Sequence, residues 1–408
     1  MTKYLLIFFL LFSLASLKAN SKYEEIDKQS KSVPDSLKTV EEIAEYLTLN
    51  LKNEDEKARA FYIWITHNIK YDLSKINSTF HGSYDKMVNE TIELKKGVCE
   101  HYSQLFHYLC KSVGIESFVI SGYTREKGSN EISELNHAWN GVEIDGDYLF
   151  IDNTFAAGYL DYRGNYIHEF SDTFFLISPK DFIRTHVPFD PVWQFLENPI
   201  SHLDFKNKDF SKLNKIGSFN YKDSISANRK LDSIIQIKKK IQRIEKSGIT
   251  HYLIRNYVNE SEEQIETLIY DKWILTFNEI NEKANKAKDE INIGIGFNNT
   301  FIDYLNKRFR NPKIGDTQIK STIEKANLHF YRGKDQLKKL KSLLYELEYA
   351  GKSTNNLKAT EKHKQELIDF IVKGENKILE VEPSILKNTD YSKRYLKTWK
   401  PLRSMVPY

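Results

Sequence analysis

The chain has 408 residues and a formal net charge of +4, from 60 Lys and Arg against 56 Asp and Glu. The charge is unevenly spread, because residues 211–408 carry 38 basic and 25 acidic side chains, whereas residues 1–210 carry 22 and 31. Only two cysteines occur, and they have no Cys/His metal spacing. This excludes a cysteine-rich zinc cluster, and we expect neither a metal nor a cofactor.

The first 19 residues have the features of a secretory signal peptide. Lys3 gives a positive start, and residues 4–17 are almost wholly apolar, which is too short for a bilayer span of about 20 residues. We therefore expect residues 1–19 to be removed and the mature protein to be exported, to the periplasm or outside the cell, with no transmembrane segment remaining. Residues 20–35 are polar and are expected to form a flexible tail.

Two helices are expected next, over residues 39–51 and 53–68. In the first, Val40, Ile43 and Leu47 share one face, which is the spacing of an amphipathic helix. Such a helix buries its apolar face against a core, so the folded part of the chain is expected to begin near residue 36.

A third helix is expected to begin near Cys99, between Gly97 and a stop at Gly114. Apolar residues recur at helical spacing along it, at Tyr102, Leu105, Phe106, Leu109, Cys110 and Val113. Cys99 therefore lies at a helix N-terminus, where unpaired N–H groups and the helix dipole favour a thiolate. Cys110 lies on the apolar face and is expected to fill the core. The two cysteines are about 16 Å apart along one helix, beyond the disulfide reach of about 7 Å.

A β-hairpin is expected over residues 138–151. Residues 138–144 and 147–151 have the pattern of strands, and the Asp-Gly pair between them is a strong two-residue turn signal. A two-residue turn fixes the register, so Ile144 is expected to pair with Asp147.

The same register brings an imidazole close to a carboxylate. Counting back pairs Trp139 with Asp152 and His137 with Thr154, and because side chains alternate along a strand, these four residues share one face. His137 and Asp152 are then diagonal neighbours within side-chain reach. A carboxylate beside an imidazole fixes its tautomer and raises its basicity. With Cys99, the set is a nucleophile, a base and an orienting acid.

Strands are also expected at residues 116–123 and 174–178, and helices dominate after residue 210. An amphipathic helix is expected to end near Gly248, and breaks are expected at Asn311-Pro312 and Glu382-Pro383. The further helices are expected at residues 260–291, 299–310, 317–348, 360–380 and 391–397.

Three short motifs resemble the Cys, His and Asp boxes of the transglutaminase-like superfamily, and are nearest to its kyphoscoliosis-peptidase-like branch. They are Gly97-Val98-Cys99, His137-Ala138-Trp139 and Asp152-Asn153-Thr154. Flanking segments at residues 57–65 with 69–72, and at residues 186–194 with 198–200, resemble the helix before the Cys box and the end of this branch's domain. Within the second flank, His186 and Trp193 are expected to pack a segment onto the core.

The resemblance implies an α+β, transglutaminase-like (papain-like) domain over residues 36–210. We expect an all-α, basic helical domain to follow at residues 211–408. The sequence departs from the family pattern at His101, where a glycine is usual. A bulky residue there could narrow the site or alter its chemistry.

The leading functional hypothesis is an exported cysteine-dependent enzyme that acts on amide bonds of a protein or peptide. Cys99 would form a thioester, His137 would act as base, and Asp152 would orient His137. The backbone N–H of Cys99 is the first oxyanion donor by position, with Trp64 and Gln104 as candidates for the second. Water as acceptor gives a peptidase or amidase, whereas an amine gives acyl transfer, and the sequence leaves both open.

The alternative is a non-catalytic binding or scaffold protein on a transglutaminase-like fold, because a fold does not fix function. A papain-like cell-wall peptidase would share the same chemistry. The basic helical half is a solvated surface or a contact for an anionic envelope component. The sequence contains no nucleic-acid-binding motif, so no nucleic-acid partner is expected.

Overall fold

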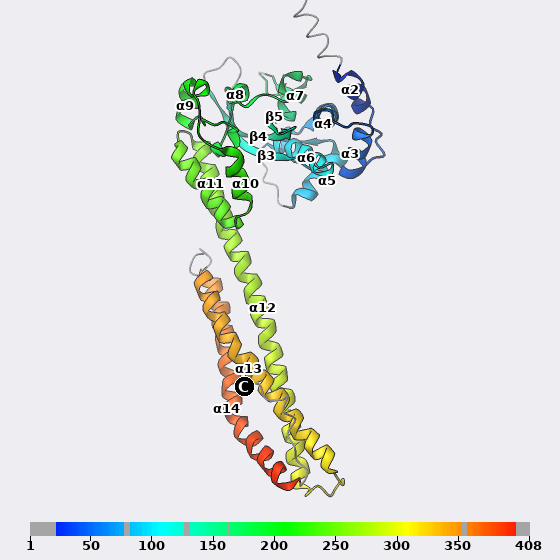
Figure 1. Cartoon of the computed structure of the whole chain (residues 1–408), viewed down its shortest axis with the longest axis vertical. Coiled ribbons are helices and arrows are strands. Elements are labelled where there is room, and N and C mark those ends of the chain that lie inside the picture. Colours follow the sequence, from blue (N-terminus) through cyan, green and yellow to red (C-terminus); the bar gives the residue numbers. More distant parts are fainter. Residues whose placement is uncertain (1–21, 77–81, 126–130, 162, 352–356, 397–408) are drawn as a thin grey trace, which may run out of the picture. The chain divides into compact units, whose positions relative to one another are not determined.

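The structure is a computed structural model that describes residues 22–76, 82–125, 131–161, 163–351 and 357–396 (Figure 1). The expected signal peptide at residues 1–19 lies outside the described residues. The chain divides into two compact units, Met1–Ser261 and Glu262–Tyr408. The first unit is α+β and the second is helical, which is the fold class that the sequence predicts.

A four-stranded antiparallel sheet with the order β5-β4-β3-β8 lies at the centre of the first unit. The predicted hairpin is confirmed as β4 and β5, with Ile144 paired to Asp147. The segment at residues 174–178 is not a strand, and the pairing there is an isolated bridge between Ile177 and Phe150. The strands are β1 (Lys70–Tyr71), β2 (Lys96–Gly97), β3 (Ser117–Arg125), β4 (Ile132–Ile144), β5 (Asp147–Ile151), β6 (Gly158–Leu160), β7 (Tyr166–His168) and β8 (His186–Pro188).

Helices pack on this sheet and enclose the main core (Figure 1). The side chains of Phe61, Trp64 and Phe106 are fully buried there. The α-helices of the unit are α2 (Glu24–Lys31), α3 (Val40–Thr48), α4 (Glu54–Asn68), α5 (Tyr84–Leu94), α6 (Cys99–Ser112), α7 (Asn153–Ala157), α8 (Pro179–Phe182), α9 (His202–Asn207), α10 (Tyr221–Arg229), α11 (Ser233–Ser247) and the start of α12 (Tyr252–Asn306). Short 3₁₀ helices include η2 (Asp172–Phe174) and η3 (Pro191–Gln194).

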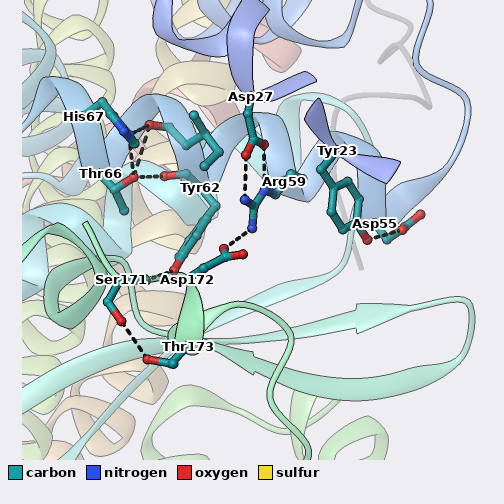
Figure 2. A network of polar contacts seen from close by, with 11 residues as sticks. Tyr23, Asp27, Asp55, Arg59, Tyr62, Thr66, His67, Ser171, Asp172 and Thr173 are labelled. Carbon is teal, nitrogen blue, oxygen red and sulfur yellow. Dashed lines mark hydrogen bonds and ion pairs between the residues drawn. The ribbon is translucent and has the colours of Figure 1, made fainter. Parts of the chain in front are cut away.

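The N-terminal segment is folded rather than a flexible tail, because α2 is held against α4 by a buried arginine (Figure 2). Arg59 is 4% exposed and donates from Nε and Nη2 to the two carboxylate oxygens of Asp27, at 2.8 and 2.7 Å. Its Nη1 also donates to Asp172 of η2. These partners are far apart in sequence, so the polar composition of residues 20–35 did not reveal the contact.

The compact first unit extends beyond the boundary expected after residue 210. Ile225 of α10 belongs to a buried cluster under the sheet, and Arg243 of α11 donates to both carboxylate oxygens of Asp190, at 2.8 and 2.6 Å. The ring of Tyr257 stacks on Phe189 at a centroid distance of 4.4 Å. The composition changes near residue 210, but the apolar faces of these helices still cover the first unit.

The basic excess is therefore shared between the two units. Residues 211–261 contain 11 Lys and Arg against 4 Asp and Glu, and they belong to the first unit. About half of the positive excess expected for a separate helical domain thus lies in residues 211–261, which include α10, α11 and the start of α12.

In the described residues, the second unit consists of the remainder of α12 with α13 (Asp316–Gly351) and α14 (Leu357–Tyr395). The predicted helices at 260–291 and 299–310 form one continuous helix, and Asn311-Pro312 lies between α12 and α13 as expected. Pro383 lies inside α14 and does not end it. Neighbouring Ile378 and Ile385 are buried in the core of the unit, and this packing outweighs the lost hydrogen bond. No described helix is both long and apolar enough to span a bilayer.

The contact between α2 and α4 leads to a prediction for Arg59. Replacement of Arg59 by Ala should lower the free energy of unfolding of the first unit by about 2 kcal/mol, because the carboxylates of Asp27 and Asp172 both lose the buried cation that binds them. This is below the usual cost of breaking a buried ion pair, since the Asp172 side chain is 56% exposed. Thermal and urea unfolding of the full chain would measure the change.

Two further variants provide controls. Arg59→Lys keeps the charge but loses the two-pronged contact, and should lie between Arg59→Ala and wild type. Lys283→Ala removes an exposed pair with Glu279 in the second unit, and should change stability by less than about 0.5 kcal/mol. An Arg59→Ala protein as stable as wild type would show that α2 is not held by this arginine.

Candidate active site

Three parts of the first unit bring the predicted site residues together. Cys99 is the first residue of α6, His137 lies on β4, and Asp152 directly follows β5. Asp152 accepts a hydrogen bond from His137, with 2.6 Å between Nε2 and Oδ2. Cys99 also interacts with His137 and helps to raise the pKa of that imidazole. Because Nε2 faces Asp152, the Nδ1 atom is the ring nitrogen left for Cys99.

The start of α6 places Cys99 at this point. A Cβ on residue 97 would lie 2.4 Å from the Cβ of His101, so only glycine fits between the strand and the helix. The pairing of β1 with β2 adds a hydrogen bond from the N–H of Asp72 to the carbonyl of Gly97, at 2.9 Å. Cys99 is half-buried, whereas Cys110 is buried, and burial raises the pKa of the Cys110 thiol.

Asp152 also starts a short helix, which corrects one expectation. Its Oδ1 accepts the backbone N–H groups of Thr154 and Phe155, each at 2.9 Å, and thereby caps α7. Thr154 is therefore helical and does not continue the strand opposite His137. The ring of Phe155 stacks on His137 at a centroid distance of 4.4 Å and covers one face of the imidazole.

The electrostatics of the pair follow from its burial and its hydrogen bonds. Burial alone would lower the pKa of His137, but the charge and hydrogen bond of Asp152, with a contribution from Cys99, hold it above its usual value. Burial would raise the pKa of Asp152, but His137 and His186 hold it below its usual range. The arrangement therefore favours an imidazolium beside a carboxylate, which is the charge state that a cysteine thiolate needs.

A second histidine, His186 of β8, reaches the same carboxylate, which the sequence did not predict. Its Nε2 lies 3.2 Å from Asp152 Oδ2, and the residue is 1% exposed. The expectation that His186 packs a segment onto the core is incomplete, because that side chain joins the polar site. The one available signal was its place at the start of the second flanking segment of the family resemblance.

His101, the departure from the family pattern, packs over Gly97 at the start of α6. Its Nδ1 accepts a hydrogen bond from the backbone N–H of Val98 at 3.4 Å, and burial lowers its pKa to about 4. A neutral imidazole thus supports the turn that places Cys99. Glycine at this position would leave that N–H without this acceptor.

The oxyanion roles of Trp64 and Gln104 stay predictions. The indole N–H of Trp64 is buried without a hydrogen-bond partner among the described residues, and Lys95 lies 4.8 Å from its ring centroid. Gln104 is buried on α6, more than one turn beyond Cys99. The first N–H groups of a helix have no intrahelical acceptor, so the N–H of Cys99 is the donor best placed by the fold.

His137, Asp152 and His186 are also the residue types that bind metals, and their ligand atoms lie within 4.8 Å of one another. Two ligands about 2.0–2.1 Å from a tetrahedral zinc ion stand about 3.3 Å apart. The His137–Asp152 distance of 2.6 Å is shorter than this. We therefore interpret the group as a hydrogen-bonded network.

Residues 41–153 match the family model of the transglutaminase-like superfamily. This match includes the predicted Cys and His boxes and the first two residues of the Asp box, and it defines the class: the chain carries a transglutaminase-like domain. Its curated relatives then place this domain in the kyphoscoliosis-peptidase-like branch.

Human (Homo sapiens) kyphoscoliosis peptidase is 27% identical over 207 residues, which cover 48% of this chain and 31% of that protein. Hillarin of Drosophila melanogaster is 27% identical over 209 residues, which cover 46% of this chain and 25% of that protein. The match thus spans less than a third of the length of these curated relatives. A solved structure of a TGase is 18% identical, covers 43% of each chain and has a TM-score of 0.23.

Proposed function

We propose that this chain is a cysteine-dependent enzyme that acts on amide bonds of proteins or peptides. One observation carries the proposal: His137 lies 2.6 Å from a buried carboxylate through Nε2, and the same imidazole interacts with the half-buried Cys99 at the start of α6. This is the order of nucleophile, base and orienting acid that acyl transfer requires. The name of the human relative, kyphoscoliosis peptidase, supports the same class of reaction.

The proposed reaction has two halves. The Cys99 thiolate, whose proton is already on His137, attacks the amide carbonyl, and the backbone N–H of Cys99 stabilises the oxyanion. The C–N bond then breaks, the amine leaves with the proton from His137, and the acyl group stays on sulfur as a thioester. Water or a second amine attacks the thioester, and its proton returns through His137 to the sulfur. Hydrolysis and transfer thus differ only in the acceptor.

Alkylation of the folded full chain by iodoacetamide tests the nucleophile. Cys99 should react first and Cys110 should be spared, because only the former is accessible and paired with an imidazole. His137→Ala should slow the labelling of Cys99 by about tenfold or more. The matched control is His107→Ala, on the same helix as Cys99. It also removes an imidazole, but one that contacts Ser117, so it should not slow the labelling of Cys99.

A substrate screen then measures the reaction itself. Wild type and Cys99→Ala are compared for peptide cleavage and for incorporation of a fluorescent amine, and Asp152→Ala should reduce either activity. Asp152→Asn, which keeps the shape but not the charge, should be less damaging if orientation dominates. Labelling of Cys99 no faster than a model thiol, unaffected by His137→Ala, would instead indicate a binding or scaffold protein on this fold.

We further propose that the protein is exported. This proposal is supported by the positive charge at Lys3 and by the apolar run over residues 4–17. Cleavage near residue 19 would retain Lys22, whose ammonium pairs with Asp55. Mass analysis of protein from its native host should find a mature start between about residues 16 and 21. An intact Met1 in a cytoplasmic fraction would contradict export.

An anionic envelope component is the partner that we propose for the basic surface. The exposed side chains of Lys230, Lys238, Lys239 and Lys246 account for part of the positive excess in residues 211–261. The full chain should bind vesicles that contain an anionic lipid, and binding should weaken as salt is added.

A charge reversal tests where this binding occurs. Lys238→Glu with Lys239→Glu on α11 should weaken vesicle binding several-fold. Lys362→Glu with Lys373→Glu on α14 changes the net charge equally at other exposed positions, and should weaken binding less. If neither added salt nor the charge reversal on α11 weakens vesicle binding, these lysines are an ordinary solvated surface and not a binding site.

A further inference from the structure

His186 occupies a defined position beside the candidate site. Its strand, β8, is the edge strand next to β3, where His186 pairs with Thr124. The imidazole stacks on Phe182 at a centroid distance of 4.1 Å, and Trp139 meets it edge-on at 5.4 Å. Aromatic packing against Phe182 and Trp139 thus holds the ring in place, in addition to its hydrogen bonds.

The two ring nitrogens of His186 have partners of different kinds. Nε2 lies 3.2 Å from Asp152 Oδ2, and Nδ1 lies 2.8 Å from Thr185 Oγ1. A carboxylate can only accept, so the proton belongs on Nε2, and Nδ1 is then free to accept the hydroxyl hydrogen of Thr185. The surroundings therefore select one neutral tautomer, with an N–H aimed at Asp152.

We propose that His186 is a positioning residue for the reaction of Cys99 and His137: a permanently neutral donor that keeps Asp152 ionised and turned toward His137. The inference rests on the proposed function, because it concerns the same site. It extends the site from three side chains to four. His186 itself does not contact the sulfur or exchange a proton during the reaction.

Counting the donors to Asp152 supports this role. The carboxylate is fully buried, and a buried charge is costly unless its lone pairs are filled. Oδ1 accepts two backbone N–H groups from α7, and Oδ2 accepts His137 and His186. Burial also lowers the pKa of His186, which keeps it neutral while His137 takes the charge.

The other titratable groups around Asp152 do not replace this donor. Cys99 on α6 interacts with His137, and the phenols of Tyr62 on α4 and Tyr71 on β1 feel the charge of Asp152 at a distance. Burial raises the pKa of both phenols, so they stay neutral. Within the described residues, His186 is thus the side chain that shares Oδ2 with His137.

The test is the pH profile of Cys99 alkylation by iodoacetamide in the full chain. In His186→Phe, the ring still stacks on Phe182 but the N–H is lost, so Asp152 becomes easier to protonate. The acid edge of the profile should then move up by about one pH unit, the equivalent of one hydrogen bond to a charged group. His186→Gln, which can still donate an amide N–H, should restore most of the wild-type profile.

His202→Phe is the matched control. His202 is fully buried, with Nδ1 2.9 Å from the Tyr123 hydroxyl and Nε2 3.0 Å from the carbonyl of Phe189. His202→Phe therefore loses two polar contacts, as His186→Phe does, but at a position outside the Asp152 network. His202→Phe should leave the acid edge in place, even if the melting temperature falls.

Thr185→Val tests the other ring nitrogen, because it removes the hydroxyl that donates to His186 Nδ1. It should move the acid edge in the same direction as His186→Phe, but by a smaller amount.

NMR of the ¹⁵N-histidine-labelled full chain provides an independent readout. It should show His186 as the neutral Nε2–H tautomer across the pH range in which Cys99 reacts. A His186→Phe profile identical to wild type would overturn the inference, as would His186→Gln as damaged as His186→Phe, or a His202→Phe shift of equal size. A charged His186 would overturn it too. If wild-type Cys99 is not activated at all, the proposed function fails first, and His186 is left as a structural hydrogen bond.

Discussion

A buried carboxylate imposes the central constraint on this molecule. Asp152 is fully shielded from water, and an unpaired charge in that position would cost several kcal/mol. The fold meets the constraint with donors from different elements: the first turn of α7, His137 of β4 and His186 of β8. Stabilising this one charge therefore fixes the relative positions of three elements, and it aims the imidazole that Cys99 contacts.

The sheet register makes this convergence possible. His137 pairs with Gly122 across β3 and β4, and His186 pairs with Thr124 across β3 and β8. Positions 122 and 124 are two residues apart on one strand, so both histidines lie on the same face. A Cβ on Gly122 would come within 2.2 Å of the carbonyl of Val187 and within 2.4 Å of the Trp139 ring. A larger residue there would separate the strands that supply the two histidines.

The part of the site that the sequence predicts depends on local contacts. The hairpin turn fixes the register of β4 and β5, and that register predicts the His137–Asp152 contact from residues only 15 positions apart. The helix that begins at Cys99 follows from Gly97 and from apolar spacing. His186 could not be found in this way, because its contact with Asp152 depends on the edge position of β8, which no local pattern encodes. The residues next to His186 in the sequence also have the pattern of ordinary core residues.

The same reasoning explains the errors in the domain boundaries. The polar segment before residue 35 gives no hint that Arg59 will bind Asp27, and the helical composition after residue 210 does not show which apolar face covers the sheet. Arg243 reveals this only through its ion pair with Asp190, and Ile225 only through the buried cluster that it shares with residues of the sheet. Pro383 was expected to end a helix by a local rule, and tertiary packing around Ile385 overrides that rule. Local signals therefore predicted elements well and long-range partners poorly.

The backbone of Asp152 connects the site to the N-terminal helix. The N–H of Asp152 donates to the carbonyl of Phe174 at 3.0 Å, and Phe174 ends η2, whose Asp172 is bound by Arg59. Arg59 also binds Asp27 of α2 (Figure 2). Asp152 is thus held at two points. Its side chain is bound by two histidines and by the N–H groups of α7, and its main chain is bound by η2, which Arg59 connects to α2. Helix α2 therefore helps to stabilise the site, because Arg59 binds both Asp27 of α2 and Asp172 of η2.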